Sequence, residues 1–356
     1  MRFNLGRWPL AAGRWPLAAG RWPLAAGRWP LAAGRWPLAA PAWFNPPAAD
    51  VAADCQAAGC GLHSCWLFRP TSRVSGHSRM IRQQPIGVFD SGVGGLSVLR
   101  EIRRELPGED LLYVADSAHA PYGDKPTEAI ETRSLAVAEF LIGRGAKAIV
   151  IACNTATGVA ARVLRARHAL PVVAMEPAVK PAAARTRSGR VGVLATRQTL
   201  ASANFARLRT RVAGQAEVLA QPCPGLVERI EQGDLDGPLT HALLEGYLTP
   251  LLEREVDTLV LGCTHYPHLR PLIERLAGPE VVVLDSGAGV ARQVRRRLAE
   301  AGLLAPLGRV GGERFWTSGE QAQVAPLIAR LWPGAPSLAV LPEPIESGVS
   351  LLREGA

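Results

Sequence analysis

The sequence predicts an α/β protein with two similar lobes, each built on a mostly parallel sheet and related by a pseudo-twofold axis. Two apolar, β-branched segments end at Cys153 and Cys263, as buried strands of a parallel sheet would. A second pair of similar segments, residues 86–91 and 191–196, precedes these two at comparable spacing, which indicates an internal duplication. Strands and helices also alternate along the chain. Ligands bind at the carboxyl ends of parallel strands, so we expect the functional site in the cleft between the lobes.

The first lobe begins with the strand that precedes Asp90 and continues with alternating helices and strands. Thr127, followed by Glu128, is typical of a helix start, and Pro171 marks the end of another helix. We expect strands at 86–89, 111–115, 148–152 and 172–175, and helices at 98–105, from 127 onward, and at 157–169.

The second lobe repeats this scheme, and the chain then returns to the first lobe. The strand before Asp285 is followed by Ser286 and Gly287, which resembles the end of the first strand of the chain. We therefore expect a discontinuous first lobe, residues 80–177 and 286–356, and a second lobe at 178–285. The elements expected here are strands from 191, at 217–220, 258–262 and 281–284, and helices at 200–212, 226–232, 238–252, 269–276 and from 290.

Residues 1–79 differ from the rest of the chain. Gly-Arg-Trp-Pro-Leu-Ala-Ala occurs five times in succession from Gly6 to Ala40 without a substitution. A proline in every copy excludes a coiled-coil heptad, and solenoid repeats are longer. The remainder of this segment has no helical or strand periodicity. We interpret residues 1–79 as a low-complexity, disordered tail produced by a mis-assigned start, with the true start at Met80.

The charge of the chain is concentrated in this tail. It carries nine arginines against Asp50 and Asp54, a net +7, so only +2 of the formal +9 belongs to residues 80–356. The folded part also lacks a cluster of basic and aromatic residues, which argues against nucleic-acid binding. No stretch approaches the ~20 apolar residues needed to cross a bilayer, and no signal-peptide core is present.

The folded part contains only three cysteines, without the spacing of a disulfide framework or a zinc motif. We expect a reducing, cytoplasmic location. Cys223, between two prolines, has no polar neighbours and reads as a structural residue. Cys153 and Cys263 are each followed by hydrogen-bonding residues, namely Asn154 and Thr155 in one case and Thr264 and His265 in the other.

Two strand-end thiols facing one substrate indicate a specific chemistry. A thiol near a helix N-terminus is expected to have a lowered pKa and to act as a base at neutral pH. One thiolate can then remove an acidic Cα proton while the opposite thiol returns a proton to the other face, which inverts the centre without a cofactor. Each cysteine alone would more simply be a small buried hydrophobe.

Neighbouring residues have alternative readings. Asp90 could cap the helix that follows it, or it could bind a substrate ammonium group and tune Cys153. His265 could be an ordinary core histidine, or it could activate Cys263. Cys263, His265 and His268 could instead bind zinc, but no fourth ligand is evident, so we expect no metal. Gly92, Gly94 and Gly95 do not form a dinucleotide-binding motif, so they give little support for nucleotide binding. Their backbone N–H groups suit contacts to a carboxylate.

Five motifs, at residues 89–97, 120–123, 152–156, 176–177 and 262–267, occur in the order typical of one family. In these motifs the chain resembles glutamate racemase, from Met80 to the C-terminus. The resemblance implies two flavodoxin-like lobes and cofactor-independent interconversion of L- and D-glutamate. It also implies a role in peptidoglycan synthesis, and hence in cell-wall biogenesis and cell shape, in the bacterial cytoplasm.

The resemblance also assigns residues. It implies that Cys153 serves D-glutamate and Cys263 serves L-glutamate. Asp90, His265 and Glu231 are implied as supporting catalytic residues, although Glu228 is close enough in sequence to compete with Glu231. The substrate-binding residues implied by the motifs are Asp90, Ser91, Tyr122, Gly123, Asn154, Thr155, Thr264 and His265.

Other activities remain open at this point. An aspartate racemase would share the fold and both cysteines, but its N-terminal motif differs, and a decarboxylase relative would lack one cysteine. Members of the glutamate racemase family have also been linked to inhibition of DNA gyrase, which would be an additional role here. The resemblance leaves the oligomeric state open, with a homodimer as one candidate, and control by a cell-wall precursor is open as well.

Overall fold

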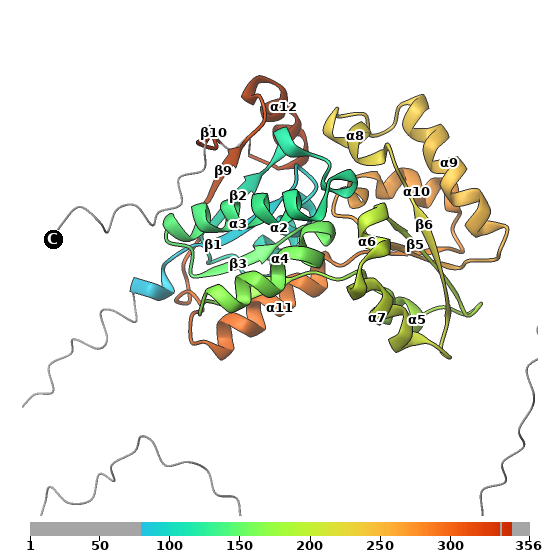
Figure 1. Cartoon of the computed structure of the whole chain (residues 1–356), viewed down its shortest axis with the longest axis horizontal. Helices are drawn as coiled ribbons and strands as arrows, with labels where there is room; N and C mark the ends of the chain where they lie inside the picture. The colour runs from blue at the N-terminus through green and yellow to red at the C-terminus, as the bar shows by residue number, and fades with distance from the viewer. Residues whose placement is uncertain (1–79, 335–336, 344–356) are drawn as a thin grey trace, which may run out of the picture. The chain divides into compact units, whose positions relative to one another are not determined.

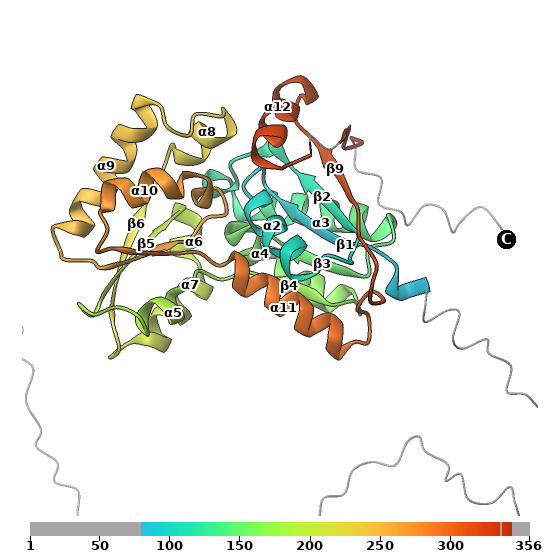
Figure 2. The same cartoon turned by 180° about the vertical axis from the view of Figure 1, so that it is seen from behind.

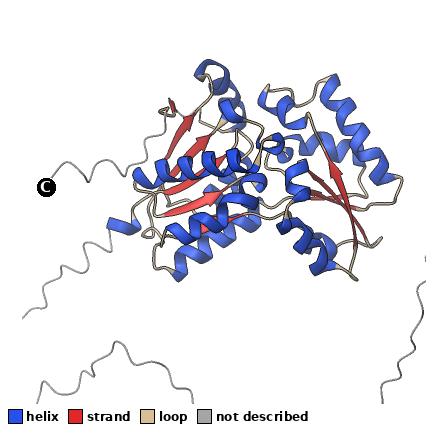
Figure 3. Cartoon of the chain, viewed as in Figure 1, coloured by secondary structure: helices blue, strands red, loops and turns tan. Residues whose placement is uncertain are grey.

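The computed structural model describes residues 80–334 and 337–343. The predictions of a disordered tail and a mis-assigned start concern residues 1–79 and lie outside the described residues. Within the described residues, two sheets carry the fold (Figures 1 and 3). No helix of this part of the chain is long and apolar enough to span a membrane.

The first sheet has six strands in the order β10-β9-β2-β1-β3-β4. Its strands are β1 (Ile86–Asp90), β2 (Leu111–Ala115), β3 (Ala148–Ile151), β4 (Val172–Ala174), β9 (Glu313–Thr317) and β10 (Leu338–Val340). The second sheet has four strands in the order β6-β5-β7-β8. They are β5 (Arg190–Ala195), β6 (Glu217–Pro222), β7 (Thr258–Leu261) and β8 (Val282–Leu284).

The two sheets share one connectivity. In each, the first strand lies between the second and the third, and the fourth follows the third, so β2-β1-β3-β4 corresponds to β6-β5-β7-β8. Every pairing between the described strands is parallel. The predicted α/β class with two mostly parallel sheets is therefore confirmed.

Helices connect the strands and cover both faces of each sheet, as parallel crossovers require. Three short turns of 3-10 helix are also present: η1 (Ser117–His119), η2 (Tyr122–Asp124) and η3 (Tyr266–Leu269). The α-helices are α2 (Leu96–Glu105), α3 (Thr127–Gly143), α4 (Asn154–Arg167), α5 (Val179–Ala183), α6 (Arg197–Ala201), α7 (Ala203–Val212), α8 (Leu226–Glu231), α9 (Pro238–Leu252), α10 (Arg270–Ala277), α11 (Gly287–Glu300) and α12 (Gln321–Leu331).

The first sheet shows how the strand pattern builds the core. Successive side chains of a strand point to opposite faces. Val88 packs in the cluster that contains residues of α2 and α11, whereas its neighbour Phe89 packs in the cluster that contains residues of α3 and α4. These helix pairs lie on opposite sides of the sheet in the two views (Figures 1 and 2). Because both faces are covered, the central strands β1, β2 and β3 are buried at every position.

The structure differs from the predicted elements in two places that concern the site. Helix α4 begins at Asn154 and not at residue 157, so Cys153 directly precedes the helix. The chain after α11 also forms β9, α12 and β10, whereas the prediction ended with a long helix. Strand β9 pairs with β2, and β10 extends the sheet beyond it.

Candidate active site

A small pocket lies where β1 and β3 of the first sheet and β7 of the second sheet end. Nine of the eleven predicted site residues line it, and Asp90 and Glu231 lie behind its wall. Three further lining residues, Pro121, Thr196 and Val227, were not predicted. Cys153 and Cys263, which follow β3 and β7, line this one pocket, so the structure brings the two predicted thiols together.

Cys153 occupies the N-cap position of α4. Its backbone is extended, with φ −140° and ψ 122°, and its Sγ accepts a hydrogen bond from the backbone N–H of Ala156 at 3.4 Å. The Oγ of Ser91 lies 3.9 Å from the same sulfur. The thiol of Cys153 is therefore oriented by α4 on one side and by the β1 end on the other.

The expectation of a lowered thiol pKa is wrong for Cys153. Burial raises the pKa of this thiol well above its ordinary value, and the nearby carboxyl of Asp90 raises it further. The hydrogen bond from Ala156 acts in the opposite direction but is the smaller effect. A buried anion loses hydration that one N–H at a helix start does not replace. Burial thus favours the neutral thiol form of Cys153.

Cys263 belongs to a chain of three side chains. Its Sγ lies 3.7 Å from Nδ1 of His265, and Nε2 of the same ring lies 2.6 Å from Oε1 of Glu231. Burial by itself lowers the pKa of His265, but the neighbouring Cys263 and Glu231 outweigh it and raise this pKa well above its ordinary value. The arrangement favours an imidazolium beside the Cys263 sulfur.

The contact with His265 distinguishes Glu231 from Glu228. Glu231 ends α8, and Oε1 also accepts a hydrogen bond from the backbone N–H of Val93 at 2.7 Å. Glu228 makes no contact with His265; it faces the adjoining pockets. Of the two carboxylates that the sequence left in competition, only that of Glu231 reaches the histidine.

The glycines after β1 allow this close packing. A Cβ on Gly92 would lie 2.0 Å from Oε1 of Glu231, and a Cβ on Gly94 would lie 2.3 Å from Nδ1 of His265. Contacts this short are not tolerated, so only glycine lets the loop approach both side chains. Backbone contact to a carboxylate was predicted for this loop, and the carboxylate that it meets here is that of Glu231.

Asp90 links the ends of the two sheets. Its Oδ1 accepts hydrogen bonds from the backbone N–H and the Oγ of Ser91, at 2.7 and 3.3 Å, and its Oδ2 accepts one from Oγ1 of Thr264 at 3.1 Å. Asp90 does not cap α2, whose N-cap is Gly95, so that alternative reading is wrong. Burial raises the pKa of Asp90, although the positive charge of His265 lowers it in part.

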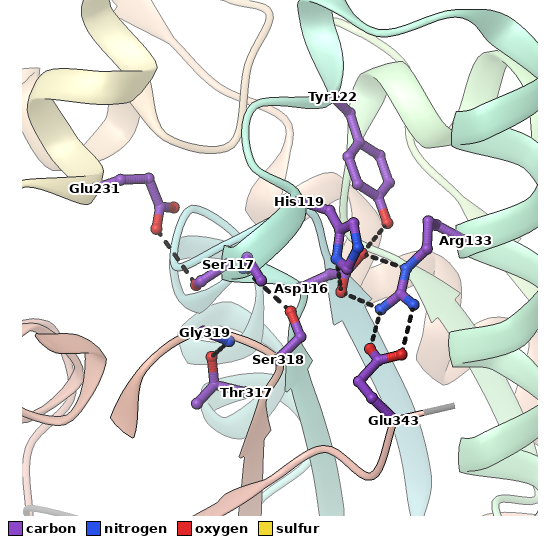
Figure 4. A network of polar contacts seen from close by, with 11 residues as sticks. Asp116, Ser117, His119, Tyr122, Arg133, Glu231, Thr317, Ser318, Gly319 and Glu343 are labelled. Carbon is purple, nitrogen blue, oxygen red and sulfur yellow. Dashed lines mark hydrogen bonds and ion pairs between the residues drawn. The ribbon is translucent and has the colours of Figure 1, made fainter. Parts of the chain in front are cut away.

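Tyr122 contributes its ring to the pocket while its hydroxyl is bound elsewhere. The hydroxyl donates a 2.6 Å hydrogen bond to Oδ2 of Asp116 (Figure 4). Gly123 follows in the same wall, and a Cβ at this position would lie 2.8 Å from Cβ of Thr196. The Tyr122–Gly123 segment therefore packs directly against Thr196, which follows β5 of the second sheet.

In the part of the chain that the structure describes, Asn154 has unpaired polar atoms in the pocket wall. It is buried and lines the pocket, yet neither its Oδ1 nor its Nδ2 has a hydrogen-bond partner among the described residues. Leaving such atoms unpaired costs about 1–3 kcal/mol each. A polar ligand that accepts from and donates to this amide would remove the penalty.

Thr196 is a pocket residue that sequence analysis missed. Its Oγ1 lies 3.0 Å from Oγ1 of Thr155, and both hydroxyls contact that of Thr199. The internal duplication contained the signal, because it aligns Thr196 with Ser91 at the equivalent strand end.

The zinc alternative has no geometric support. Both ring nitrogens of His265 already have partners, and in residues 80–334 and 337–343 the ligand atoms of Cys263, His265 and His268 do not converge. The one cluster of this kind in that part of the chain is formed by Asp116, His119 and Glu343. The guanidinium of Arg133 already pairs with both carboxylates of that cluster.

Comparison with known proteins decides the family. Residues 86–294 match the family described as Asp/Glu/Hydantoin racemase. A glutamate racemase of Pseudomonas paraeruginosa is 57% identical over 258 residues, which cover 72% of this chain and 97% of the relative. The chain belongs to the glutamate racemase family. Glutamate racemase of Methylococcus capsulatus is 55% identical over 75% of this chain and 98% of its own length.

Solved structures of the glutamate racemase family agree. A glutamate racemase isoform from Bacillus anthracis superposes with a TM-score of 0.68 at 31% identity, covering 74% of this chain and 99% of that one. Glutamate racemase of Escherichia coli, solved with L-glutamate and an activator, gives a TM-score of 0.63 at 33% identity over 72% of this chain and 98% of that chain. As a glutamate racemase by family, the protein is an enzyme of the isomerase class.

Proposed function

We propose that this pocket interconverts L- and D-glutamate without a cofactor, using Cys153 and Cys263 as the two acid/base groups. The observation that carries the proposal is that both thiols line one pocket while each has its own polar support. Ser91 and the start of α4 hold Cys153, and His265 with Glu231 supports Cys263.

The proposed reaction is a balanced transfer of two protons. Starting from D-glutamate, the thiolate of Cys153 takes the Cα proton and becomes a thiol. The thiol of Cys263 delivers its proton to the opposite face of Cα and becomes a thiolate, which gives L-glutamate. The reverse reaction begins with Cys263 as the base. Positioned groups of this kind supply about 10²–10⁴-fold of rate acceleration each.

The bound substrate brings a positive charge close to Cys153. Burial keeps Cys153 neutral in the free enzyme, so a thiolate is favoured only when a cation comes close. The α-ammonium of glutamate is such a cation, and Asp90, its proposed partner, lies directly behind the pocket residues Ser91 and Thr264. The proton that Cys153 loses passes to solvent as the substrate enters, and the thiolate left behind is the base that acts on Cα.

The remaining polar groups suit the rest of glutamate. The unpaired amide of Asn154 and the hydroxyls of Ser91 and Thr155 can bind a carboxylate and stabilise the charge that develops on it when Cα loses its proton. The backbone of Gly123 and residue Thr264 are proposed as further contacts, as the motifs implied. The pocket lining contains no lysine or arginine, so neutral donors do this work.

Substrate entry requires movement. The cavity has a volume of about 10 Å³, which is roughly the space of one water molecule. We propose that residues 80–177 with 286–356 and residues 178–285 form the two lobes, and that they separate to admit glutamate. The product D-glutamate would serve peptidoglycan synthesis in the cytoplasm, a location consistent with three free cysteines in the described residues.

Isotope exchange tests the proposal. The protein is incubated with D-glutamate in deuterated water without added cofactor or metal, and optical activity and Cα deuteration are recorded for wild type, Cys153→Ala and Cys263→Ala. We expect wild type to lose optical activity with deuterium uptake and both variants to lose racemisation. Cys223→Ala is the matched control, because this buried cysteine lies outside the thiol pocket, and it should stay within about twofold of wild type.

Each result has a distinct meaning. Full racemisation by either alanine variant would refute the two-thiol mechanism. Racemisation of aspartate with inert glutamate would refute the substrate assignment while leaving the mechanism in place.

A further inference from the structure

Arg133, on α3, binds two carboxylates at once outside the pocket. Its Nε and Nη2 donate to Oδ2 and Oδ1 of Asp116 at 3.1 and 2.6 Å. Its Nη1 and Nη2 donate to Oε2 and Oε1 of Glu343 at 3.2 and 2.8 Å (Figure 4). The Asp116 side chain is fully buried, whereas 44% of the Glu343 side chain is exposed. Arg133 therefore joins the end of β2 to the segment that follows β10.

Asp116 in turn holds the pocket wall. Besides Arg133, it accepts the Tyr122 hydroxyl and contacts Nδ1 of His119 at 3.1 Å. The side chain of Asp116 thus fixes the start of a loop to Tyr122, six residues further along the chain. Because Tyr122 and Gly123 line the pocket, a shift of Asp116 would move the wall against which the substrate lies.

Two more contacts hold the same loop. The backbone N–H of Ala118 donates to Oγ of Ser318 at 3.1 Å, and Oγ of Ser117 lies 3.4 Å from Oε2 of Glu231. Figure 4 shows these side chains around one loop, with Glu231 on one side and Arg133 on the other. Polar contacts therefore run from Glu343 through this loop to the carboxylate that supports His265.

We infer that Arg133 is a positioning residue for the Tyr122–Gly123 wall of the substrate pocket, and that Glu343 fixes Arg133 in that role. The inference rests on the proposed function of the pocket. Arg133 touches neither thiol, so it acts only through Asp116. A planar guanidinium can bind both carboxylates in a fork, whereas a lysine ammonium is a point charge.

The charge state of the pair supports this role. Burial alone would raise the pKa of Asp116, but the hydrogen bonds from Arg133 and Tyr122 lower it, so the carboxylate stays ionised. An ionised Asp116 is the form that accepts all of these donors together. The wall is then held by charge-assisted hydrogen bonds, which are stronger than neutral ones.

The test measures KM and kcat for both enantiomers with Arg133→Lys and Glu343→Gln. The matched control is Arg144→Lys, which changes the arginine at the C-cap of α3. The guanidinium of Arg144 stacks on Phe140, 4.7 Å from the ring centroid. We expect KM to rise about tenfold for Arg133→Lys and about threefold for Glu343→Gln, with kcat changed less than twofold. Such a pattern indicates loss of uniform substrate binding.

A purely structural role gives another pattern. Lower thermal stability with an unchanged KM in both variants would overturn the inference, as would an equal rise of KM in Arg144→Lys. Glu343→Gln keeps the buried Asp116–Arg133 pair, so it decides the outcome if Arg133→Lys does not fold. Wild type measured in the same series separates the two proposals: inactive wild type would refute the proposed function, and unchanged variants of an active wild type would refute only the positioning role.

Discussion

The carboxylate of Glu231 and the imidazole of His265 meet at 2.6 Å, although they follow different strands of the second sheet. His265 is almost completely buried, and the side chain of Glu231 is 15% exposed. The other nitrogen of the ring, Nδ1, contacts the Cys263 sulfur. The support of one thiol therefore depends on a carboxylate at the end of α8.

Replacing Glu231 with glutamine should weaken the Cys263 half of the reaction. The amide can still hydrogen-bond to His265 but cannot stabilise its positive charge, so the pKa of His265 falls. We expect kcat from L-glutamate to fall about tenfold or more, equivalent to about 1.4 kcal/mol, and the pH–rate profile to move to lower pH. Glu228→Gln is the control and should keep the wild-type profile. Equal losses in the two variants would contradict this role of Glu231.

Adding one methyl group at Gly94 should inactivate the enzyme. The new Cβ would lie 2.3 Å from Nδ1 of His265, so the ring must move away from Cys263. We expect Gly94→Ala to lower kcat/KM by about 100-fold, since misplacement by 1 Å can cost that much. Gly143→Ala provides the control, because a Cβ there meets nothing within 4 Å. Wild-type kinetics in Gly94→Ala would show that the loop can yield.

Removing the hydroxyl of Thr196 should weaken substrate binding more than it destabilises the fold. Its Oγ1 caps α6 and contacts Thr155 across the pocket. The control is Ser202→Ala, which removes an equivalent cap from α7, outside the pocket lining. Each variant should lose about 1 kcal/mol of unfolding free energy. Only Thr196→Val should raise KM, by several-fold. If KM is the same in Thr196→Val as in Ser202→Ala, Thr196 does not contribute to substrate binding.

His268 should make the fold sensitive to mild acid. Burial, together with the nearby His265, lowers the pKa of His268 to about 4. The unfolded chain binds this proton below the ordinary histidine pKa of about 6.5, whereas the folded chain does not until the pH nears 4. Stability is therefore lost as the pH falls through this window, by at most about 3 kcal/mol. Chemical denaturation of wild type and His268→Gln at several pH values should show a shallower slope in the variant.

Strand-end positions could be predicted from sequence because they follow from a local pattern. Runs such as the one before Cys153 are apolar at every position, which marks a parallel strand covered on both faces. The carboxyl ends of such strands meet at one edge of a sheet, so Asp90 and Cys153 could be expected together, and the duplication placed Cys263 at the equivalent edge of the second sheet. The polar residues next to them in sequence could be predicted as site residues for the same reason. These predictions needed only the order of residues along the chain.

Other features depended on packing. Glu228 and Glu231 are three residues apart on one helix, so they share a face and the sequence could not choose between them. The last strands were missed because β10 is a short edge strand and β9 begins with the charged residues Glu313 and Arg314, so both depend on the neighbours that they pair with. The C-terminal segment that reaches Arg133 was missed for the same reason.

By itself, the sequence determined the α/β class, the duplication, the family resemblance and nine of the residues that line the pocket. Only the tertiary structure decided the partner of His265, the role of Thr196 and the charge state of Cys153. A strand end and a helix start are local features, and they argued for a thiolate. The loss of hydration on burial depends on every residue packed around the sulfur, and that sum favours the neutral thiol at Cys153.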